Sequence, residues 1–187
     1  MPEIVLVRHG ETEWSRDGKH TGNTDVPLTE RGRKQAEAIG EALRGRGFAR
    51  VLTSPLSRAA ETARLAGFGD RAQERDELRE WDYGEYEGRT TPEIREERPG
   101  WSLWRDSVPD GETAADVDER VDRLLAELRT GEGDVLVFAH GHVLRVLAAR
   151  WIGLGPESGR SFALDPATIS ILGQERETPV IRVWNAA

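Results

Sequence analysis

The chain has 187 residues and is 37% hydrophobic, which is enough for one well-buried core and short for two, so we expect a single domain over residues 1–187. A formal net charge of −8 excludes a broad surface for nucleic acid or an anionic membrane, although a local arginine cluster can still hold a small anion. The absence of cysteine excludes disulfides, thiol nucleophiles and thiolate metal sites.

The first predicted element is a buried strand at about residues 3–7, because Ile4 to Val7 is an apolar, β-branched run. It leads directly into Arg8, His9 and Gly10. In an open α/β sheet, ligands bind in the crevice beyond the carboxyl ends of the strands, so Arg8 and His9 are expected at that rim. Gly10 is expected to let a ligand approach the backbone closely. For this stretch alone, the alternative is a solvated loop that happens to hold an arginine and a histidine.

The next segment, residues 13–27, is polar and is predicted to be a loop. Thr29 is an N-cap type of residue, and the apolar residues after it keep helical spacing up to Leu43. We therefore expect a helix there, stopped by Gly45 and Gly47.

A second strand is predicted over residues 48–53, and it ends at Ser54. Pro55 fits the start of a helix that continues through Arg58 to Gly67. A second strand thus ends at a serine followed by an arginine.

Residues 69–91 are charged and turn-rich, and they hold tryptophan and tyrosine among many acids, which suggests the wall of a functional loop. A short helix is expected from Thr91 to Pro99, followed by Trp101, Trp104 and a turn cluster. We interpret residues 81–112 as a small lid-like insertion, in which the tryptophans are expected to pack in the core or the lid rather than stack on a ligand.

The longest predicted helix covers residues 113–129, with acids early in it as the helix dipole prefers. An apolar strand over 134–139 then leads into His140, Gly141 and His142, and a helix follows to Trp151. Short strands are expected at 161–164, 168–172 and 180–184.

Because strands and helices alternate, we predict an α/β three-layer sandwich. Its central sheet is mainly parallel with helices on both faces and some antiparallel pairing near the C-terminus. Three strand ends then converge on one rim, with the side chains of Arg8, His9, Ser54, Arg58, His140 and His142. Guanidinium groups, imidazole N–H groups and backbone amides are what a phosphate dianion requires. A histidine among arginines is also a credible nucleophile, since nearby positive charge keeps its imidazole neutral near pH 7.

These residues also form a pattern in chain order: Arg8-His9-Gly10-Glu11-Thr12, Leu28-Thr29-x-x-Gly32, Ser54-Pro55-x-x-Arg58-Ala59-x-x-Thr62, Glu80 before Gly84-x-x-Glu87-Gly88, and His140-Gly141. The pattern resembles the histidine phosphatase (phosphoglycerate mutase-like) superfamily. The stretches around Trp14-Ser15, His20-Thr21-Gly22, Leu78 to Gly88, Trp104-Arg105 and Phe138 to Arg145 look closest to its acid phosphatase and sedoheptulose-bisphosphatase branch.

The resemblance implies a phosphatase that hydrolyses phosphate monoesters of small sugars or related metabolites through a phosphohistidine. It implies that His9 is the nucleophile, and that Arg8, Arg58 and His140 bind the phosphoryl group. Glu80 is then the general acid and later the base, a role typically worth roughly 10²–10⁴-fold in rate. Glu77, Asp82, Glu85 and Glu87 are acidic neighbours of Glu80, so one of them is the alternative for this role.

Several further residues are candidates for phosphate or substrate contacts. Ser15 stands where many relatives have a phosphate-contacting asparagine, and Gly141 is expected to offer its backbone to the phosphate. For His142 the alternatives are a substrate contact and a histidine that bonds backbone at a helix start. The remaining candidates for substrate contacts are His20, Thr21, Gly22, Tyr83 and Arg105.

Three alternatives to a phosphatase stay open from sequence. Phosphoglycerate mutases of this superfamily carry a longer insertion and an extended C-terminal segment, whereas only residues 89–111 lie here between the acid motif and the long helix, so we expect net hydrolysis. A zinc hydrolase built on His9, His140 and His142 is disfavoured by the neighbouring arginines. A non-catalytic binder of phosphorylated molecules is disfavoured by the presence of both His9 and Glu80.

We expect no cofactor and no metal, and a small phosphorylated metabolite as the partner. No nucleic acid or membrane partner is expected, and a homodimer is one option for the oligomeric state. The chain lacks a charged-then-apolar leader and a run of about 18 apolar residues, so we expect a cytoplasmic location.

Overall fold

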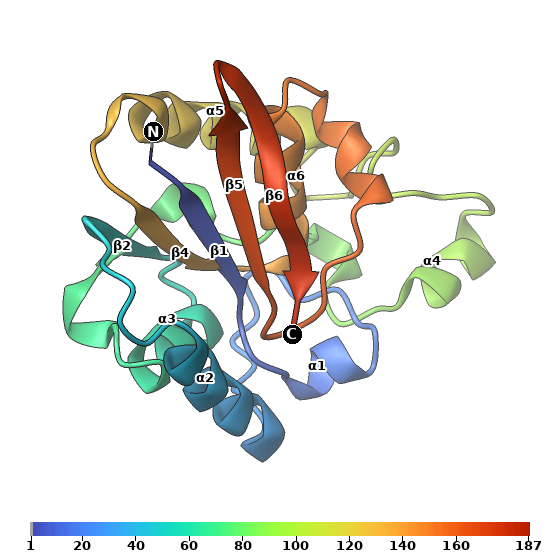
Figure 1. Cartoon of the computed structure of the whole chain (residues 1–187). Coiled ribbons are helices and arrows are strands. Elements are labelled where there is room, and N and C mark those ends of the chain that lie inside the picture. Colours follow the sequence, from blue (N-terminus) through green and yellow to red (C-terminus); the bar gives the residue numbers. More distant parts are fainter. Residues whose placement is uncertain (1) are drawn as a thin grey trace.

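A six-stranded sheet runs through the computed structural model, which describes residues 2–187. Its order is β3 (Ala72–Glu74), β2 (Arg50–Thr53), β4 (Val135–Ala139), β1 (Ile4–Arg8), β5 (Ile169–Glu175) and β6 (Thr178–Ala186). The strands from β3 to β1 are parallel, whereas β5 and β6 run antiparallel as a hairpin at one side (Figure 1). This confirms the predicted mixed α/β fold with a mainly parallel sheet.

The register of the central strands brings their carboxyl ends to one level. Arg8 at the end of β1 pairs with Ala139 at the end of β4, and Thr53 of β2 pairs with Phe138 of β4. The residues that follow these strands therefore emerge at the same edge of the sheet, as the sequence predicted.

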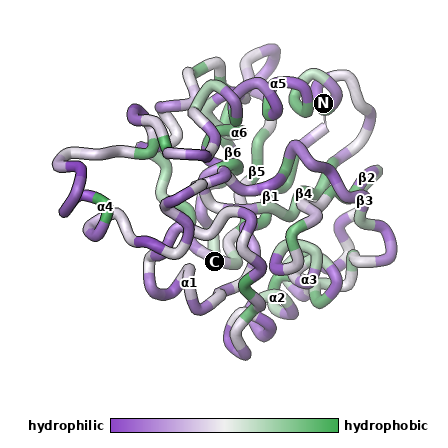
Figure 2. Tube along the Cα trace, turned by 180° about the vertical axis from the view of Figure 1, so that it is seen from behind, coloured by the Kyte–Doolittle hydropathy of each residue, from purple (hydrophilic) through white to green (hydrophobic). Residues whose placement is uncertain are grey.

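Helices cover both faces of the sheet, and the strand side chains alternate between them. Val5 and Val7 of β1 point into an apolar cluster with α2 (Glu30–Ala42) and α3 (Ser57–Leu65). Ile4 and Leu6 point the other way, into a larger cluster with α5 (Ala114–Thr130) and α6 (Gly141–Trp151). Figure 2 shows the hydrophobic segments at the centre of the molecule, with the hydrophilic ones around them. This two-sided burial explains why β1 and β4 are apolar throughout.

The helix starts follow the capping chemistry in the sequence. The Thr29 hydroxyl accepts from the Gly32 amide at the start of α2, and Thr113 and Asp116 form a capping box at the start of α5. A second such box, between Thr90 and Glu93, begins α4 (Thr91–Glu97). No helix within residues 2–187 is long and apolar enough to cross a membrane.

Residues 81–112, expected to be a small lid-like insertion, include α4, which projects from one side of the molecule (Figure 1). The root of this segment is well packed. Trp101 is buried against Tyr86 and the His20 ring, and Trp104 packs against Trp81. The tryptophans of this segment therefore pack in the protein interior, which is consistent with the packing role predicted for them.

Several local predictions are wrong. The polar segment 13–27 contains a short helix, α1 (Glu13–Arg16), because Thr12 and Ser15 cap each other's backbone amides. The turn-rich segment 69–91 contains the edge strand β3, whose polar three-residue sequence carries no apolar alternation. The segment also holds the 3-10 turns Gly69–Arg71, Asp76–Leu78 and Gly84–Tyr86.

Two further predictions, one of a strand and one of a helix start, differ from the structure. Residues 161–164 are not a strand: a 3-10 helix, Pro156–Ser161, leads into an irregular segment. Its carbonyls accept from side chains instead of a neighbouring strand, with Ala163 bonded to Trp184 and Leu164 to Arg8. The helix expected from Pro55 begins at Ser57, because the Ser54 hydroxyl accepts from the Leu56 amide and shapes the turn before it.

Candidate active site

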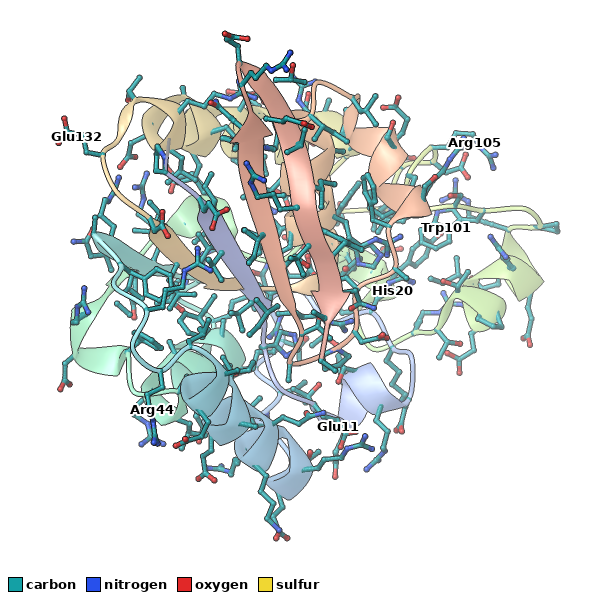
Figure 3. The ribbon with its side chains drawn as sticks, viewed as in Figure 1. Glu11, His20, Arg44, Trp101, Arg105 and Glu132 are labelled. Atoms are coloured by element: carbon teal, nitrogen blue, oxygen red, sulfur yellow. The ribbon has the colours of Figure 1, made fainter. Side chains whose placement is uncertain are left out.

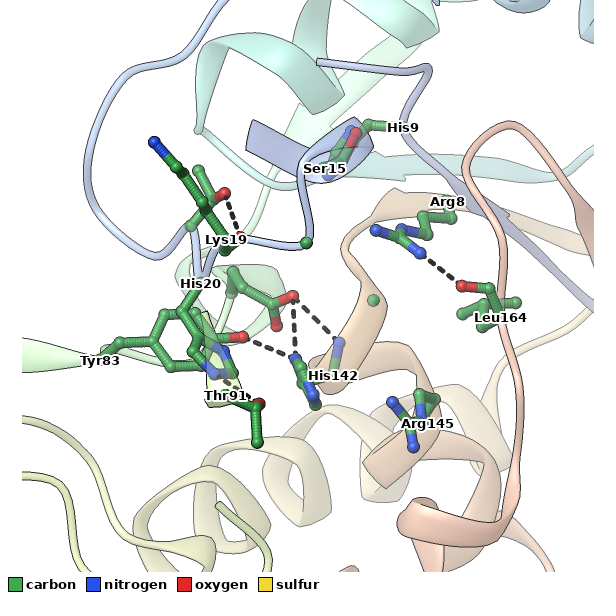
Figure 4. A pocket seen from close by; sticks show the side chains of 14 residues that line it. Arg8, His9, Ser15, Lys19, His20, Tyr83, Thr91, His142, Arg145 and Leu164 are labelled. Carbon is green, nitrogen blue, oxygen red and sulfur yellow. Dashed lines mark hydrogen bonds and ion pairs between the residues drawn. The ribbon is translucent and has the colours of Figure 1, made fainter. Parts of the chain in front are cut away.

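A cavity of about 250 Å³ opens at the carboxyl edge of the parallel strands (Figure 4). Its wall combines residues from three distant parts of the chain: 8–21, 80–91 and 141–164. All four histidines of the chain lie at or near it. We call Arg8, His9, Arg58 and His140 the inner end of the site. Lys19, His20, Tyr83, His142 and Arg145 form what we call its outer wall.

His9 is buried at the inner end with a defined tautomer. Its Nδ1 lies 2.7 Å from the Gly10 carbonyl oxygen. Because a carbonyl only accepts, Nδ1 carries the proton, and Nε2 keeps its lone pair. Burial, followed by the charges of Arg58 and Arg8, holds the pKa of His9 well below its usual value. The imidazole is therefore neutral and has a nucleophilic Nε2 at neutral pH.

Gly10, which follows, packs closely against α2. A Cβ there would lie 2.3 Å from the Gly32 carbonyl oxygen of α2, so the missing side chain makes room for a helix. The Gly10 amide donates to the Thr62 hydroxyl of α3. Gly10 and Thr62 thus fix the backbone of His9 against both helices.

Arg58 rises from the first turn of α3 and is fully buried. Its terminal nitrogens donate to the carbonyls of Thr21, Gly22 and Thr24, at 2.9–3.2 Å. Arg8 donates from Nη1 to the carbonyl of Leu164. In both guanidiniums, the Nε atom is buried and has no partner within residues 2–187.

His140 follows β4 and is also fully buried, with its ring centre 5.2 Å from that of His9. Its Nε2 lies 2.7 Å from the Ser54 hydroxyl, and its Nδ1 has no partner within the described chain. Burial, and then the charge of Arg58, holds the pKa of His140 well below its usual value. Buried nitrogens without partners are rare and costly, so a cluster of them around His9 indicates a place for an acceptor-rich anion.

Glu80 lies on the cavity wall with both carboxylate oxygens held by backbone amides. Oε1 accepts from Trp81 and Val143 at 3.0 and 2.9 Å, and Oε2 accepts from His142 at 2.9 Å. Two of these donors belong to the first turn of α6, where the helix dipole favours an acid. Since Oε1 already accepts two bonds and Oε2 one, Oε2 keeps the lone pair that can exchange a proton.

Arg120 of α5 holds the backbone around Glu80 in place. This nearly buried guanidinium donates to the carbonyls of Glu77, Arg79 and Glu80 at 2.8–3.2 Å. It also pairs with Glu112, at 2.8 Å from Nε to Oε1. Three acidic neighbours of Glu80 are engaged elsewhere: Glu77 pairs with Arg75, Asp82 accepts from the side-chain amide of Asn23, and Glu87 accepts from the backbone amide of Gly22.

On the outer wall, the Tyr83 hydroxyl lies 2.6 Å from Nδ1 of His142. Burial raises the pKa of Tyr83 well above its usual value, so the phenol donates and Nδ1 accepts. His142 is then the Nε2–H tautomer, and burial, followed by the charge of Arg145, lowers its pKa. His20 lies 3.2 Å from the Thr91 hydroxyl through Nε2, and burial lowers its pKa to about 4. The outer wall therefore presents neutral imidazoles.

Other predicted contacts take varied positions. Ser15 and Gly141 are on the cavity wall, but the Ser15 hydroxyl donates to the Thr12 carbonyl, so its proton is used locally. Thr21 lines the cavity, whereas Gly22 lies behind it, where its amide donates to Glu87.

Arg105 is not brought to the cavity. It donates to the Gly100 carbonyl and pairs with Asp106. Figure 3 shows it at the periphery, away from His20.

Sequence reasoning missed two cations and three neutral residues on this wall, namely Lys19, Arg145, Gly18, Thr91 and Leu164. A signal for Arg145 was present, because it lies three residues after His142 on a predicted helix and so shares its face. Lys19 offered none, since it lies in an irregular segment.

The zinc alternative, which the sequence disfavours, also finds no support in the geometry. Within residues 2–187, no group of three or more His, Asp or Glu side chains is arranged to hold a metal ion. Nδ1 of His142 is bonded to Tyr83, and Nδ1 of His9 to Gly10.

Comparison with known proteins gives a consistent result. The family model of the histidine phosphatase superfamily (branch 1) matches residues 4–187. An acid phosphatase of Mycobacterium tuberculosis is 44% identical over 176 residues, covering 92% of this chain and 86% of the relative. Sedoheptulose 1,7-bisphosphatase of Saccharomyces cerevisiae is 41% identical over 187 residues, covering 82% of this chain and 69% of the relative. The solved structure of an open reading frame product of Mycobacterium tuberculosis superposes with a TM-score of 0.94 at 41% identity, covering 100% of this chain and 98% of that one.

Proposed function

The chain belongs to the histidine phosphatase superfamily and is a phosphoric monoester hydrolase, and we propose that it cleaves small sugar phosphates and related metabolites through a phosphohistidine on His9. The arrangement of side chains at the inner end of the site supports this mechanism. A neutral His9 with a free Nε2 lies among buried nitrogens of Arg8, Arg58 and His140 that have no partner in residues 2–187.

In the first step, these nitrogens bind the phosphate oxygens and place phosphorus in line with Nε2 of His9. The Nε2 lone pair forms the N–P bond while the bond from phosphorus to the ester oxygen breaks. The ring gains positive charge as the N–P bond forms, and the Gly10 carbonyl, bonded to Nδ1–H, stabilises that charge. The reaction depends on positioning and on charge stabilisation, which two arginines can supply without a metal.

Glu80 moves the protons. Its Oε2 gives a proton to the departing ester oxygen, which leaves as an alcohol. In the second step, the same oxygen takes a proton from water as the water attacks phosphorus, and phosphate and free His9 are regenerated. The amides of Trp81, His142 and Val143 keep this carboxyl group in one orientation through both steps.

The substrate class rests on the relatives and on the size of the cavity. One relative is named for a sugar bisphosphate, and the cavity of about 250 Å³ suits a small metabolite. Residues 81–112 close one side of the site as a small cover. Strands from both ends of the chain share one sheet, which supports a single domain.

A turnover screen tests this proposal. Purified protein is incubated with fructose 1,6-bisphosphate, 3-phosphoglycerate and p-nitrophenyl phosphate, with and without EDTA, and released phosphate is measured. We expect hydrolysis that EDTA leaves unchanged and that vanadate inhibits competitively, since vanadate occupies the site of the phosphoryl group. Loss of turnover on chelation, restored by zinc, would contradict the metal-free mechanism.

A further inference from the structure

We propose that Arg145 forms a second anion-binding position, so that the preferred substrates are phosphate monoesters whose alcohol part carries a carboxylate or a second phosphate. This inference rests on the proposed function, because it concerns the leaving group of the same reaction. It adds a specificity-determining residue that the reaction itself does not need.

Arg145 is a partly buried cation on the cavity wall, and no carboxylate pairs with it within residues 2–187. Its Nε donates to the Gly159 carbonyl at 2.9 Å, and its guanidinium stacks over Trp104, with Cζ 4.7 Å from the ring centre. The two terminal nitrogens are left for another acceptor. Burial lowers the pKa of Arg145, yet an arginine stays charged, so a desolvated cation faces the cavity.

The surroundings of Arg145 form a built site. Gly159 has no side chain, and a Cβ there would lie 2.6 Å from the Trp104 ring, so the glycine leaves room for Trp104 beside the guanidinium. Trp104 in turn packs against His142, at 5.3 Å between ring centres. This packing fixes the direction of the guanidinium, which makes a planar, two-point contact with a carboxylate or phosphate favourable.

One segment of the chain holds both cavity arginines. The carbonyl of Gly159 accepts from Arg145, and that of Leu164 accepts from Arg8, whose buried Nε has no partner within residues 2–187. Figure 4 shows Arg8 and Arg145 on the same side of the cavity, whereas Lys19 extends toward the other side. Arg145 lies four positions after Gly141 on α6, or about 6 Å along the helix. That spacing suits a leaving group of a few carbons with an anion at its far end.

The charge on the wall agrees with this assignment. Arg8, Lys19 and Arg145 bring positive charge to the cavity, and Glu80 brings one carboxylate. The inner end is matched to the phosphoryl group, so the charge of Arg145 remains for a second anion. The neighbouring His142 and His20 are neutral and do not supply it.

The test uses three substrates that share one primary ester. Glycerol 3-phosphate has a neutral far end, 3-phosphoglycerate has a carboxylate there, and glycerol 1,3-bisphosphate has a second phosphate. We expect wild type to prefer one or both anionic substrates over glycerol 3-phosphate by about tenfold or more in kcat/KM. Arg145→Gln should bring that ratio close to one, and Arg145→Lys should restore part of it.

Arg160→Gln is the matched control, because Arg160 is the exposed neighbour of Gly159, and it should keep the wild-type ratio. The two anionic substrates show whether carboxylate or phosphate is favoured. An unchanged ratio in Arg145→Gln would overturn the inference, as would a wild-type ratio near one for both substrates. Absence of phosphate release by wild type from these esters and from p-nitrophenyl phosphate would instead overturn the proposed function.

Discussion

The inner end and the outer wall of the site both contain arginine and histidine, but they are built from different parts of the fold. Arg8, His9, Arg58 and His140 follow the ends of parallel strands and are held by backbone carbonyls and a hydroxyl. His20, Tyr83, His142 and Arg145 depend on an irregular segment, on the projecting segment 81–112 and on the face of α6. The sheet therefore positions the residues of the reaction, whereas the segments around the sheet set the fit of the leaving group.

The largest expected effect is at the inner end. Arg58→Lys should lower kcat/KM by about 10³-fold for alkyl and aryl phosphates alike, because the lost Nε contact acts on the phosphoryl oxygens and not on the leaving group. Steady-state kinetics with glycerol 3-phosphate and p-nitrophenyl phosphate measure this, with circular dichroism to confirm folding. A loss confined to one substrate would move Arg58 to the leaving-group side.

Glu80 lies where the two regions meet, and its effect should depend on the leaving group. Glu80→Gln should lower kcat for glycerol 3-phosphate by about 10²-fold or more, and far less for p-nitrophenyl phosphate, whose leaving group needs little protonation. Equal losses on the two substrates would assign the proton to another acid of residues 77–87.

His20 should make the outer wall sensitive to pH. Its pKa is about 4 in the folded protein and near 6.5 in the unfolded chain. Its contribution to stability is complete above pH 6.5 and is lost as the pH falls toward 4, because only the unfolded chain then binds the proton. The loss amounts to at most about 3 kcal/mol.

Chemical unfolding of wild type and His20→Gln between pH 7.5 and 4.5 measures this contribution. The wild type should lose stability more steeply than the variant over this range. Parallel pH profiles would show that His20 is not held neutral by burial.

The smallest expected effect is that of Tyr83→Phe. Removing the bond to Nδ1 of His142 frees the imidazole tautomer, at a cost of about 1 kcal/mol. We expect KM for an alkyl phosphate to rise by about fivefold with little change in kcat. A hundredfold fall in kcat would place Tyr83 in the chemistry and would erase the distinction between the two regions.

The inner end and the outer wall also differ in how well the sequence predicts them. The inner end was predictable, because apolar runs mark buried strands and parallel topology aligns their ends, which brought His9, Arg58 and His140 together. The outer wall was harder to predict, because an irregular backbone has no regular periodicity that shows where its side chains point. Arg105 was expected at the site but pairs with Asp106, and Lys19 lines the cavity without any signal.

The failed strand at 161–164 has the same origin. These residues have apolar character, yet their carbonyls bind side chains, including that of Arg8, and such pairings are set by tertiary structure. The edge strand β3 is short and polar, so alternation could not reveal it. Helix N-caps, by contrast, depend on residues close together in the sequence, as at Thr29 and Thr113.

We propose that His9 takes the phosphoryl group on Nε2, because its Nδ1 is bound to the Gly10 carbonyl. Rapid quench of wild type during turnover of p-nitrophenyl phosphate, followed by mass spectrometry of peptides at alkaline pH, tests it most directly. We expect an acid-labile phosphoryl group on Nε2 of His9. In His9→Ala, both this group and turnover should be absent. A phosphoryl group on Nδ1 or on another residue, or continued turnover by His9→Ala, would contradict it.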